Sequence, residues 1–203
     1  LMSAIVIIDS TMDLSRSYKI EAHDVDNYKH SASRLPVGTI LDGYTLMHLA
    51  LMSSDNRAIS ALMHNYPGGY HKGISEMNIH AKSLGMVNTS FVDPTGLYPQ
   101  NKSTPHDLAI LIDYAAKYHL IHQYTTTKNR LLQLNRRQLT YLNSNGLVRR
   151  GDWNTIQASK TGFTIEAGHC LVMSLNDNGN VYSVVVLNAG SNNERFAIPD
   201  RLR

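Results

Sequence analysis

Apolar residues recur at helical spacing over roughly the first 125 residues of the chain. One such pattern covers residues 46–50, and a second covers 58–62, after the polar stretch 53–56. A third spans 74–84. A fourth follows Thr104-Pro105-His106-Asp107, where an N-cap residue precedes a proline and an acid. We predict a helix for each of these four patterns.

The last third of the chain has the pattern of β-strands. Strands are predicted over residues 155–164, 170–175 and 181–187, the last of them rich in β-branched residues. Residues 176–180, Asn-Asp-Asn-Gly-Asn, are typical of a hairpin turn between the second and third strands. A short helix is expected from Glu194 onward. Helices followed by an antiparallel sheet indicate an α+β fold in which helices cover the sheet.

The composition is that of a folded domain without a large surplus of charge. The chain has 203 residues, of which 42% are hydrophobic and 17% charged, and its net charge is +3. It contains no block of lysine and arginine, so nucleic acid is not a predicted partner. No apolar run exceeds five residues, whereas a membrane-spanning helix needs about 20.

Cysteine and histidine offer little ligand or redox chemistry. Cys170 is the single cysteine, which excludes an internal disulfide, and its place in a predicted strand indicates a small core side chain. The ten histidines are scattered. His119 and His122 lie one helical turn apart, but no acid is spaced to complete a site with them. We therefore predict no metal site from these residues.

The first residues of the chain are unusual for the start of a domain. Residues 1–8 are mostly apolar, with no helix cap, turn residue or initiator methionine ahead of them. We predict a helix over residues 1–10. Because a natural domain rarely begins inside an apolar element, we expect an upstream part of the protein to be missing from this chain.

Two short motifs can carry chemistry. Ser54-Asp55-Asn56 lies between two predicted helices, and Lys160-Thr161-Gly162 ends a predicted strand. Each has a simpler explanation, since the first is also typical of a helix N-cap and the second consists of common residues. Their order and their positions on these elements make the pair more informative than either motif alone.

Together with their flanking residues, the motifs resemble those of the low-molecular-mass penicillin-binding proteins. The similar segments are residues 51–58, 64–70, 81–86, 160–164 and 167–172, so the resemblance extends through almost the whole chain. Within the D-alanyl-D-alanine carboxypeptidase/endopeptidase family, the sequences of these segments are most similar to the D-alanyl-D-alanine endopeptidases, the penicillin-binding protein 7 type.

The resemblance implies a β-lactamase/transpeptidase-like fold, an antiparallel sheet covered by helices beside an all-helical subdomain, here without its N-terminal strands. We expect residues 1–203 to form a single domain that is incomplete at its N-terminus. The helical subdomain is expected over about 12–125. The sheet part is expected over about 126–203, together with the N-terminal helix 1–10.

The implied activity is serine-type acyl transfer on peptidoglycan stem peptides that end in D-Ala-D-Ala. β-Lactam antibiotics are the implied covalent inhibitors, and a bacterial periplasmic or extracellular location is implied. Neither a metal nor an organic cofactor is implied. By the resemblance, Ser54 relays a proton to the leaving amine, and Asn56 binds the substrate backbone and orients the base. A terminal carboxypeptidase and a cross-link endopeptidase both remain open.

The third motif has its own implied roles. Lys160 supplies positive charge for the substrate carboxylate, and the Thr161 hydroxyl binds the same group. Gly162 lets the strand backbone approach the ligand, and the N–H of Phe163 is one donor of the oxyanion hole.

The first motif of the family, Ser-x-x-Lys, is missing. None of the eight lysines has a serine three residues before it. In the family this tetrad precedes an apolar stretch like that at residues 1–4, so we expect it immediately before Leu1. The isolated chain is therefore expected to be inactive. A non-catalytic, truncated remnant that binds peptidoglycan or β-lactams is the alternative function.

Two further expectations concern the missing segment and a rival enzyme. In the family, strands before the nucleophile pair with the last strand of the sheet, here residues 181–187. We therefore expect this edge to need the chain's own N-terminal fragment or another molecule. A class A β-lactamase is disfavoured, because no glutamate in the chain has an asparagine four residues later.

Overall fold

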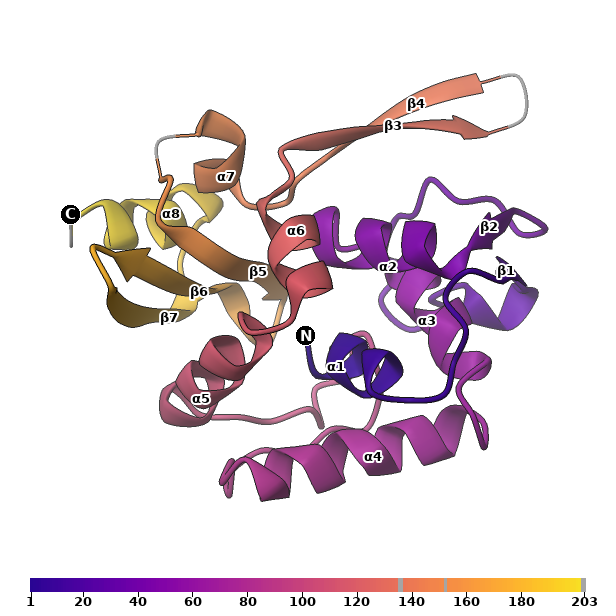
Figure 1. The fold of residues 1–203 in the computed structure, drawn as a ribbon, viewed down its shortest axis with the longest axis horizontal. Coiled ribbons are helices and arrows are strands. Elements are labelled where there is room, and N and C mark those ends of the chain that lie inside the picture. The colour runs from indigo at the N-terminus through magenta and orange to yellow at the C-terminus, as the bar shows by residue number, and fades with distance from the viewer. Residues whose placement is uncertain (135–136, 152, 202–203) are drawn as a thin grey trace.

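The computed structural model describes residues 1–134, 137–151 and 153–201 (Figure 1). A three-stranded sheet lies at one side of the molecule, α2 and α3 lie at the other, and α1 and α6 lie between them. The helices are α1 (Met2–Ile8), η1 (Ala22–Asp24), α2 (Gly43–Met52), α3 (Asn56–His64), α4 (Tyr70–Ser83), α5 (Pro105–Ala115), α6 (His119–Thr126), α7 (Gly146–Arg150) and α8 (Asn192–Asp200). The strands are β1 (Ser17–Lys19), β2 (Ile40–Asp42), β3 (Asn129–Leu134), β4 (Arg137–Leu142), β5 (Ile156–Thr164), β6 (Gly168–Asp177) and β7 (Asn180–Ala189).

The predicted strands and their hairpin are confirmed. The sheet has the order β5-β6-β7 and is antiparallel throughout. Asn178 and Gly179 form the turn between β6 and β7, with φ angles of 51° and 86°. Positive φ at both central residues is what a tight hairpin turn with the right-handed twist of its strands requires.

Helices cover both faces of this sheet. Leu171, Met173 and Leu175 alternate along β6 and pack with residues of α7 and α8 in one apolar cluster. Val172 points to the opposite face, where it joins Ala158 of β5 in the main core. Alternate residues of a strand face opposite sides, so the two clusters define two covered faces. This is the predicted α+β arrangement.

Local sequence signals explain where the predicted helices begin. Asp42 caps α2 by accepting a hydrogen bond from the Thr45 backbone N–H at 2.8 Å. Thr104 caps α5 by accepting from the Asp107 N–H at 3.2 Å, with Pro105 in the first turn, as predicted. Gly85, with φ of 81°, follows the end of α4.

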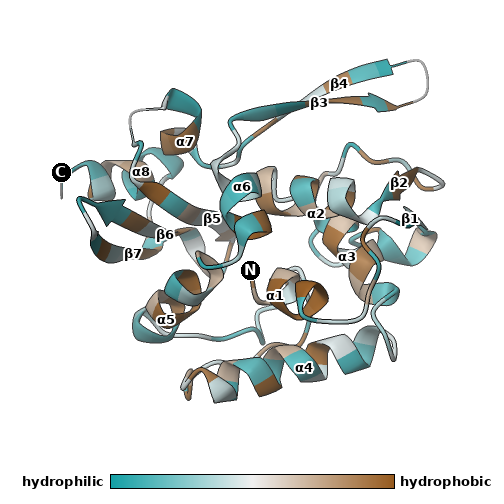
Figure 2. Ribbon diagram, in the orientation of Figure 1, coloured by the Kyte–Doolittle hydropathy of each residue, from teal (hydrophilic) through white to brown (hydrophobic). Residues whose placement is uncertain are grey.

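The first residues of the chain lie in the main core. Residues 2–7 are buried, and α1 packs against α3, α4 and α5. Figure 2 shows this short apolar helix between the sheet and α4. The structure therefore confirms a helix at the start of the chain, although it ends at Ile8 rather than at residue 10.

Two small ladders were not predicted. β1 pairs with β2, and β3 pairs with β4 in a hairpin that projects from the body (Figure 1). In the β3–β4 hairpin only Leu132 and Tyr141 are buried among the described residues, so the strands lack a strong alternation of apolar and polar positions. Within residues 1–134, 137–151 and 153–201, no helix has the length and apolar character needed to cross a bilayer.

Candidate active site

The motif Ser54-Asp55-Asn56 occupies the sharp junction between α2 and α3. Asp55 is the N-cap of α3, and its side chain accepts a hydrogen bond from the Ala58 N–H at 3.1 Å. Ser54 has a φ of 59°, a left-handed conformation that is costly for a residue with a Cβ atom. The N-cap explanation is thus correct for Asp55 but does not account for the strained Ser54.

The motif Lys160-Thr161-Gly162 lies in the second half of β5. The Lys160 ammonium Nζ donates a hydrogen bond to Ser54 Oγ at 2.6 Å and another to the Thr161 carbonyl at 2.8 Å. The structure therefore brings together two motifs that are 106 residues apart in the sequence. Lys160 spans the boundary between the helical side and the sheet.

The two motifs line a groove with two lobes that meet at Lys160. The lobe on the helical side has a volume of about 50 Å³ and is lined by Ser54, Asp55 and Asn56. The lobe on the sheet side has a volume of about 220 Å³ and is lined by Thr161 and Gly162, among others. Lys160 lines both lobes.

Packing within the protein does not explain Gly162. A Cβ atom added there would meet only the Cys170 Cβ, at an ordinary contact distance of 3.7 Å. Gly162 and Cys170 both line the sheet-side lobe of the groove. The role of Gly162 in letting a ligand approach the strand stays a prediction.

Lys160 places a cation at both lobes of the groove, which Asp55 and Asp93 also line. Burial lowers the pKa of the Lys160 ammonium from 10.5 to about 8, and the positive charge of Arg195 contributes to the same change. Arg195 is itself largely buried and donates hydrogen bonds to the Gly162 carbonyl at 2.9 Å and the Cys170 carbonyl at 3.2 Å. Among the described residues, no carboxylate forms an ion pair with Lys160. The groove therefore suits an anionic group.

Serine hydroxyls support the motif residues from behind. Ser31 Oγ accepts a hydrogen bond from Asn56 Nδ2 at 3.0 Å, and Ser33 Oγ donates to the Asp55 carboxylate at 2.9 Å. Burial raises the pKa of the Asp55 carboxyl, and the Ser33 hydrogen bond opposes this change. Sequence analysis missed both serines because no motif links them to residues 22 to 25 positions away.

Ser144 is a third missed residue and connects the two sides of the groove. Its hydroxyl accepts a hydrogen bond from Thr161 Oγ1 at 2.7 Å. Its backbone N–H donates to the Met52 carbonyl at the end of α2, at 2.8 Å. Thr161 is therefore held in place relative to the helix that leads into Ser54.

Phe163 and Cys170 lie on neighbouring strands, β5 and β6, at the sheet side of the groove. The Phe163 side chain is 57% exposed and stacks on the His169 ring, with ring centroids 4.4 Å apart. The core position expected for Cys170 is wrong, because its side chain is half-buried and lines the sheet-side lobe. Its partner across the β5–β6 ladder is Gly162, which has no side chain to cover it.

The structure also assembles a group of potential metal ligands outside the groove. His23, Asp24 and His64 each place a ligand atom within 4.8 Å of the others. Sequence analysis missed this group because His64 is 40 residues from Asp24 and no spacing rule connects them. At the pair considered from the sequence, His122 Nδ1 instead contacts the Gln157 carbonyl at 2.6 Å.

The fold and the paired motifs agree with the comparison to known protein families. The family model described as D-alanyl-D-alanine carboxypeptidase, peptidase S11, matches residues 1–191. The chain therefore belongs to this family, which confirms the resemblance seen in the sequence.

Two curated relatives are D-alanyl-D-alanine endopeptidases. The Escherichia coli (strain K12) protein is 42% identical over 205 residues, and the Pseudomonas aeruginosa protein is 40% identical over the same length. Each alignment covers 100% of this chain but 66% of the relative, so the chain spans just under two thirds of their length.

A solved structure supports the fold over nearly the whole chain. The Streptomyces K15 DD-transpeptidase superposes with a TM-score of 0.89 and 26% sequence identity, covering 99% of this chain and 82% of that one. The predicted transpeptidase-like fold is thus confirmed.

Proposed function

We propose that the protein to which this chain belongs is a serine-type D-Ala-D-Ala peptidase that acts on peptidoglycan stem peptides and is acylated by β-lactams. The observation that carries the proposal is the 2.6 Å contact between Lys160 Nζ and Ser54 Oγ inside a groove lined by both motifs. Membership of the D-alanyl-D-alanine carboxypeptidase family supports the same substrate class.

In the proposed reaction a serine oxygen attacks the carbonyl between two D-alanines. The C–N bond breaks, the amine leaves with a proton, and water later releases the acyl group. We assign the proton relay toward the leaving amine to Ser54, whose hydroxyl lies within hydrogen-bond distance of Lys160. Asn56 lines the same lobe and is assigned to the substrate backbone.

The sheet side of the groove is assigned to the substrate carboxylate. Lys160 offers an ammonium without an acidic partner among the described residues, and Thr161 adds a hydroxyl beside it. The N–H of Phe163 is assigned to the oxyanion hole, and Gly162 to close approach of the ligand.

We further propose that the nucleophile and its lysine base belong to a Ser-x-x-Lys segment joined to Leu1 in the longer protein. Leu1 and Lys160 both line the two lobes of the groove, which supports a position for such a segment beside the groove. Of the described strands, only β6 pairs with β7, which leaves the outer edge of β7 for a further strand from the same protein. If the chain is nicked, that N-terminal fragment is its partner.

The division into parts and the location belong to the same proposal. We assign residues 12–125 to a helical subdomain, and residues 126–203 with the helix 1–10 to the sheet part. A periplasmic or extracellular site of action follows from a peptidoglycan substrate, and the curated relatives described above are bacterial.

Labelling with a fluorescent penicillin followed by denaturing electrophoresis tests the proposal. We expect covalent label on the full-length protein and none on the 203-residue chain alone. We also expect the label to be greatly slowed by Ser54→Ala, with Ser83→Ala on the exposed end of α4 as a matched control. Binding that is saturable but lost on denaturation supports a non-catalytic remnant instead. Label on a serine of this chain contradicts the assignment.

A further inference from the structure

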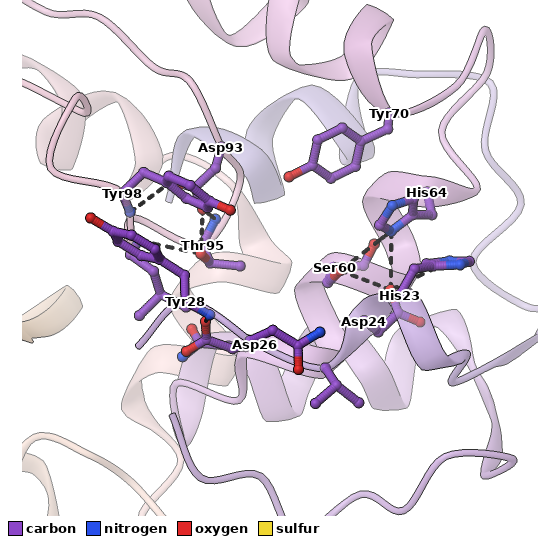
Figure 3. Close-up of a pocket in the computed structure, with 14 residues that line it drawn as sticks. His23, Asp24, Asp26, Tyr28, Ser60, His64, Tyr70, Asp93, Thr95 and Tyr98 are labelled. Carbon is purple, nitrogen blue, oxygen red and sulfur yellow. Dashed lines mark hydrogen bonds and ion pairs between the residues drawn. The ribbon is translucent and has the colours of Figure 1, made fainter. Parts of the chain in front are cut away.

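A second pocket, of about 440 Å³, lies on the helical side of the molecule (Figure 3). Its wall shares Asn56 and Thr95 with the groove, so the two cavities adjoin. His23, Asp24 and His64 lie together in this wall. His23 and Asp24 come from η1, and His64 is the last residue of α3.

The ligand atoms of these three residues are close enough to share one ion. His64 Nδ1 lies 3.0 Å from Asp24 Oδ1, and His23 Nε2 lies 3.9 Å from the same oxygen. With bonds of about 2.0 Å, ligand atoms around tetrahedral zinc lie about 3.3 Å apart. The histidine-to-carboxylate distances bracket this value. The His23 side chain, 55% exposed, can rotate to close the remaining gap.

The carboxylate between the two imidazoles is held in a fixed orientation. Asp24 Oδ1 accepts a hydrogen bond from Ser60 Oγ at 2.8 Å, and Oδ2 accepts one from the Glu21 backbone N–H at 2.8 Å. The Asp24 side chain is 1% exposed. Hydrogen bonds of this kind orient metal-bound carboxylates in known sites.

The charges around Asp24 also favour a cation. The only cationic partners of its carboxylate in ion pairs among the described residues are His23 and His64, which carry charge only when protonated. His64 Nδ1 faces two oxygens, Asp24 Oδ1 at 3.0 Å and the Ser60 carbonyl at 3.1 Å. A divalent ion bound at Nδ1 and at Asp24 Oδ1 neutralises the buried carboxylate.

We propose that His23, Asp24 and His64 form a zinc-binding site in the wall of this pocket. Two imidazoles and one carboxylate are a ligand set that zinc accepts. Three protein ligands leave a fourth position for water, and all three residues line the pocket. The Tyr70 ring, stacked on His64 with centroids 4.5 Å apart, helps to fix that imidazole. The site does not depend on the proposed peptidase activity.

Calorimetric titration of the chelator-treated, full-length protein with zinc chloride at pH 7.5 tests the proposal. We expect one zinc ion per protein and an increase in Tm on zinc addition. His23→Gln and His64→Gln should each weaken binding by at least about 10-fold, as loss of a metal-site partner does. His106→Gln, at a side chain that is 83% exposed on α5, is the matched control and should bind zinc unchanged.

Several outcomes overturn the proposal. These are the absence of zinc binding, binding that neither variant weakens, and binding weakened by His64→Gln but not by His23→Gln. Because His64 is partly buried, circular dichroism of His64→Gln checks its fold, whereas the exposed His23 can be replaced without that concern. Penicillin labelling is a separate measurement, so failure of the zinc site leaves the peptidase proposal standing.

Discussion

Replacing Lys160 by methionine should stabilise the folded protein near neutral pH while it abolishes penicillin labelling. Burial lowers the pKa of the Lys160 ammonium from 10.5 to about 8, which means that the folded state disfavours the charged form. A fall of that size corresponds to about 3 kcal/mol. Because the side chain keeps some exposure toward the groove, we expect a gain of about 1–2 kcal/mol for Lys160→Met at pH 7.

The gain in stability from Lys160→Met should depend on pH. Below pH 8 the ammonium is charged in both the folded and unfolded states, so the full cost of burial is present. Between pH 8 and 10.5 the folded state has lost the proton and the unfolded state still holds it, so the stability of the unmodified protein rises. The advantage of Lys160→Met should therefore shrink over this range.

Urea denaturation of the two full-length proteins at pH 7 and pH 10 measures the difference directly. Lys160→Arg serves as a comparison, because it keeps a cation that cannot lose its proton in this range. A Lys160→Met protein that is less stable than the parent at pH 7 would refute the reasoning. It would mean that the hydrogen bonds to Ser54 and the Thr161 carbonyl outweigh the cost of burying the charge.

Three further perturbations probe the groove. Ser54→Gly should raise the stability by about 1 kcal/mol in thermal melts, because glycine adopts the left-handed conformation of this residue without strain. The same change should slow penicillin labelling by about 10²-fold or more. Unchanged labelling contradicts the proton relay. A bulky thiol reagent on Cys170 should slow labelling of the parent and leave Cys170→Ala unaffected, because this side chain lines the groove. Arg195→Met should lower the free energy of unfolding by about 1–3 kcal/mol in urea melts, since it removes the donors to the Gly162 and Cys170 carbonyls; a neutral change shows that water replaces them.

Periodicity and turn chemistry were enough to predict most of the elements around the groove. The Thr104–Asp107 start of α5 and the turn at 176–180 each combine several local signals that agree with one another. The β3–β4 hairpin has no such agreement. Few of its side chains are buried, so burial imposes little alternation on the sequence.

Some residues of the candidate site could likewise be predicted from the sequence, and others could not. We could single out Ser54 and Lys160, which the structure brings together, because each belongs to a run of consecutive residues that resembles a family motif. Ser31 and Ser144 reach the motif residues through tertiary contacts alone, and a hydroxyl in a loop is common in any sequence. The wrong prediction for Cys170 has a different cause. Its exposure depends on the glycine opposite it, which strand periodicity does not register.

The features that conflict with stability in this fold gather at the proposed site. Ser54 has a backbone conformation that suits glycine, and Lys160 is a largely buried cation whose ion-pair partner is found nowhere among the described residues. Packing explains neither residue. A glycine in place of Ser54 and an apolar side chain in place of Lys160 would each lower the free energy of the folded state. A ligand with a carboxylate would supply the missing anion for Lys160. The hydrogen bond from Lys160 fixes the Ser54 hydroxyl, to which we assign the proton relay. The strain at Ser54 and the charge of Lys160, unpaired within the described part of the chain, thus support the proposal that this site binds an anionic peptide end.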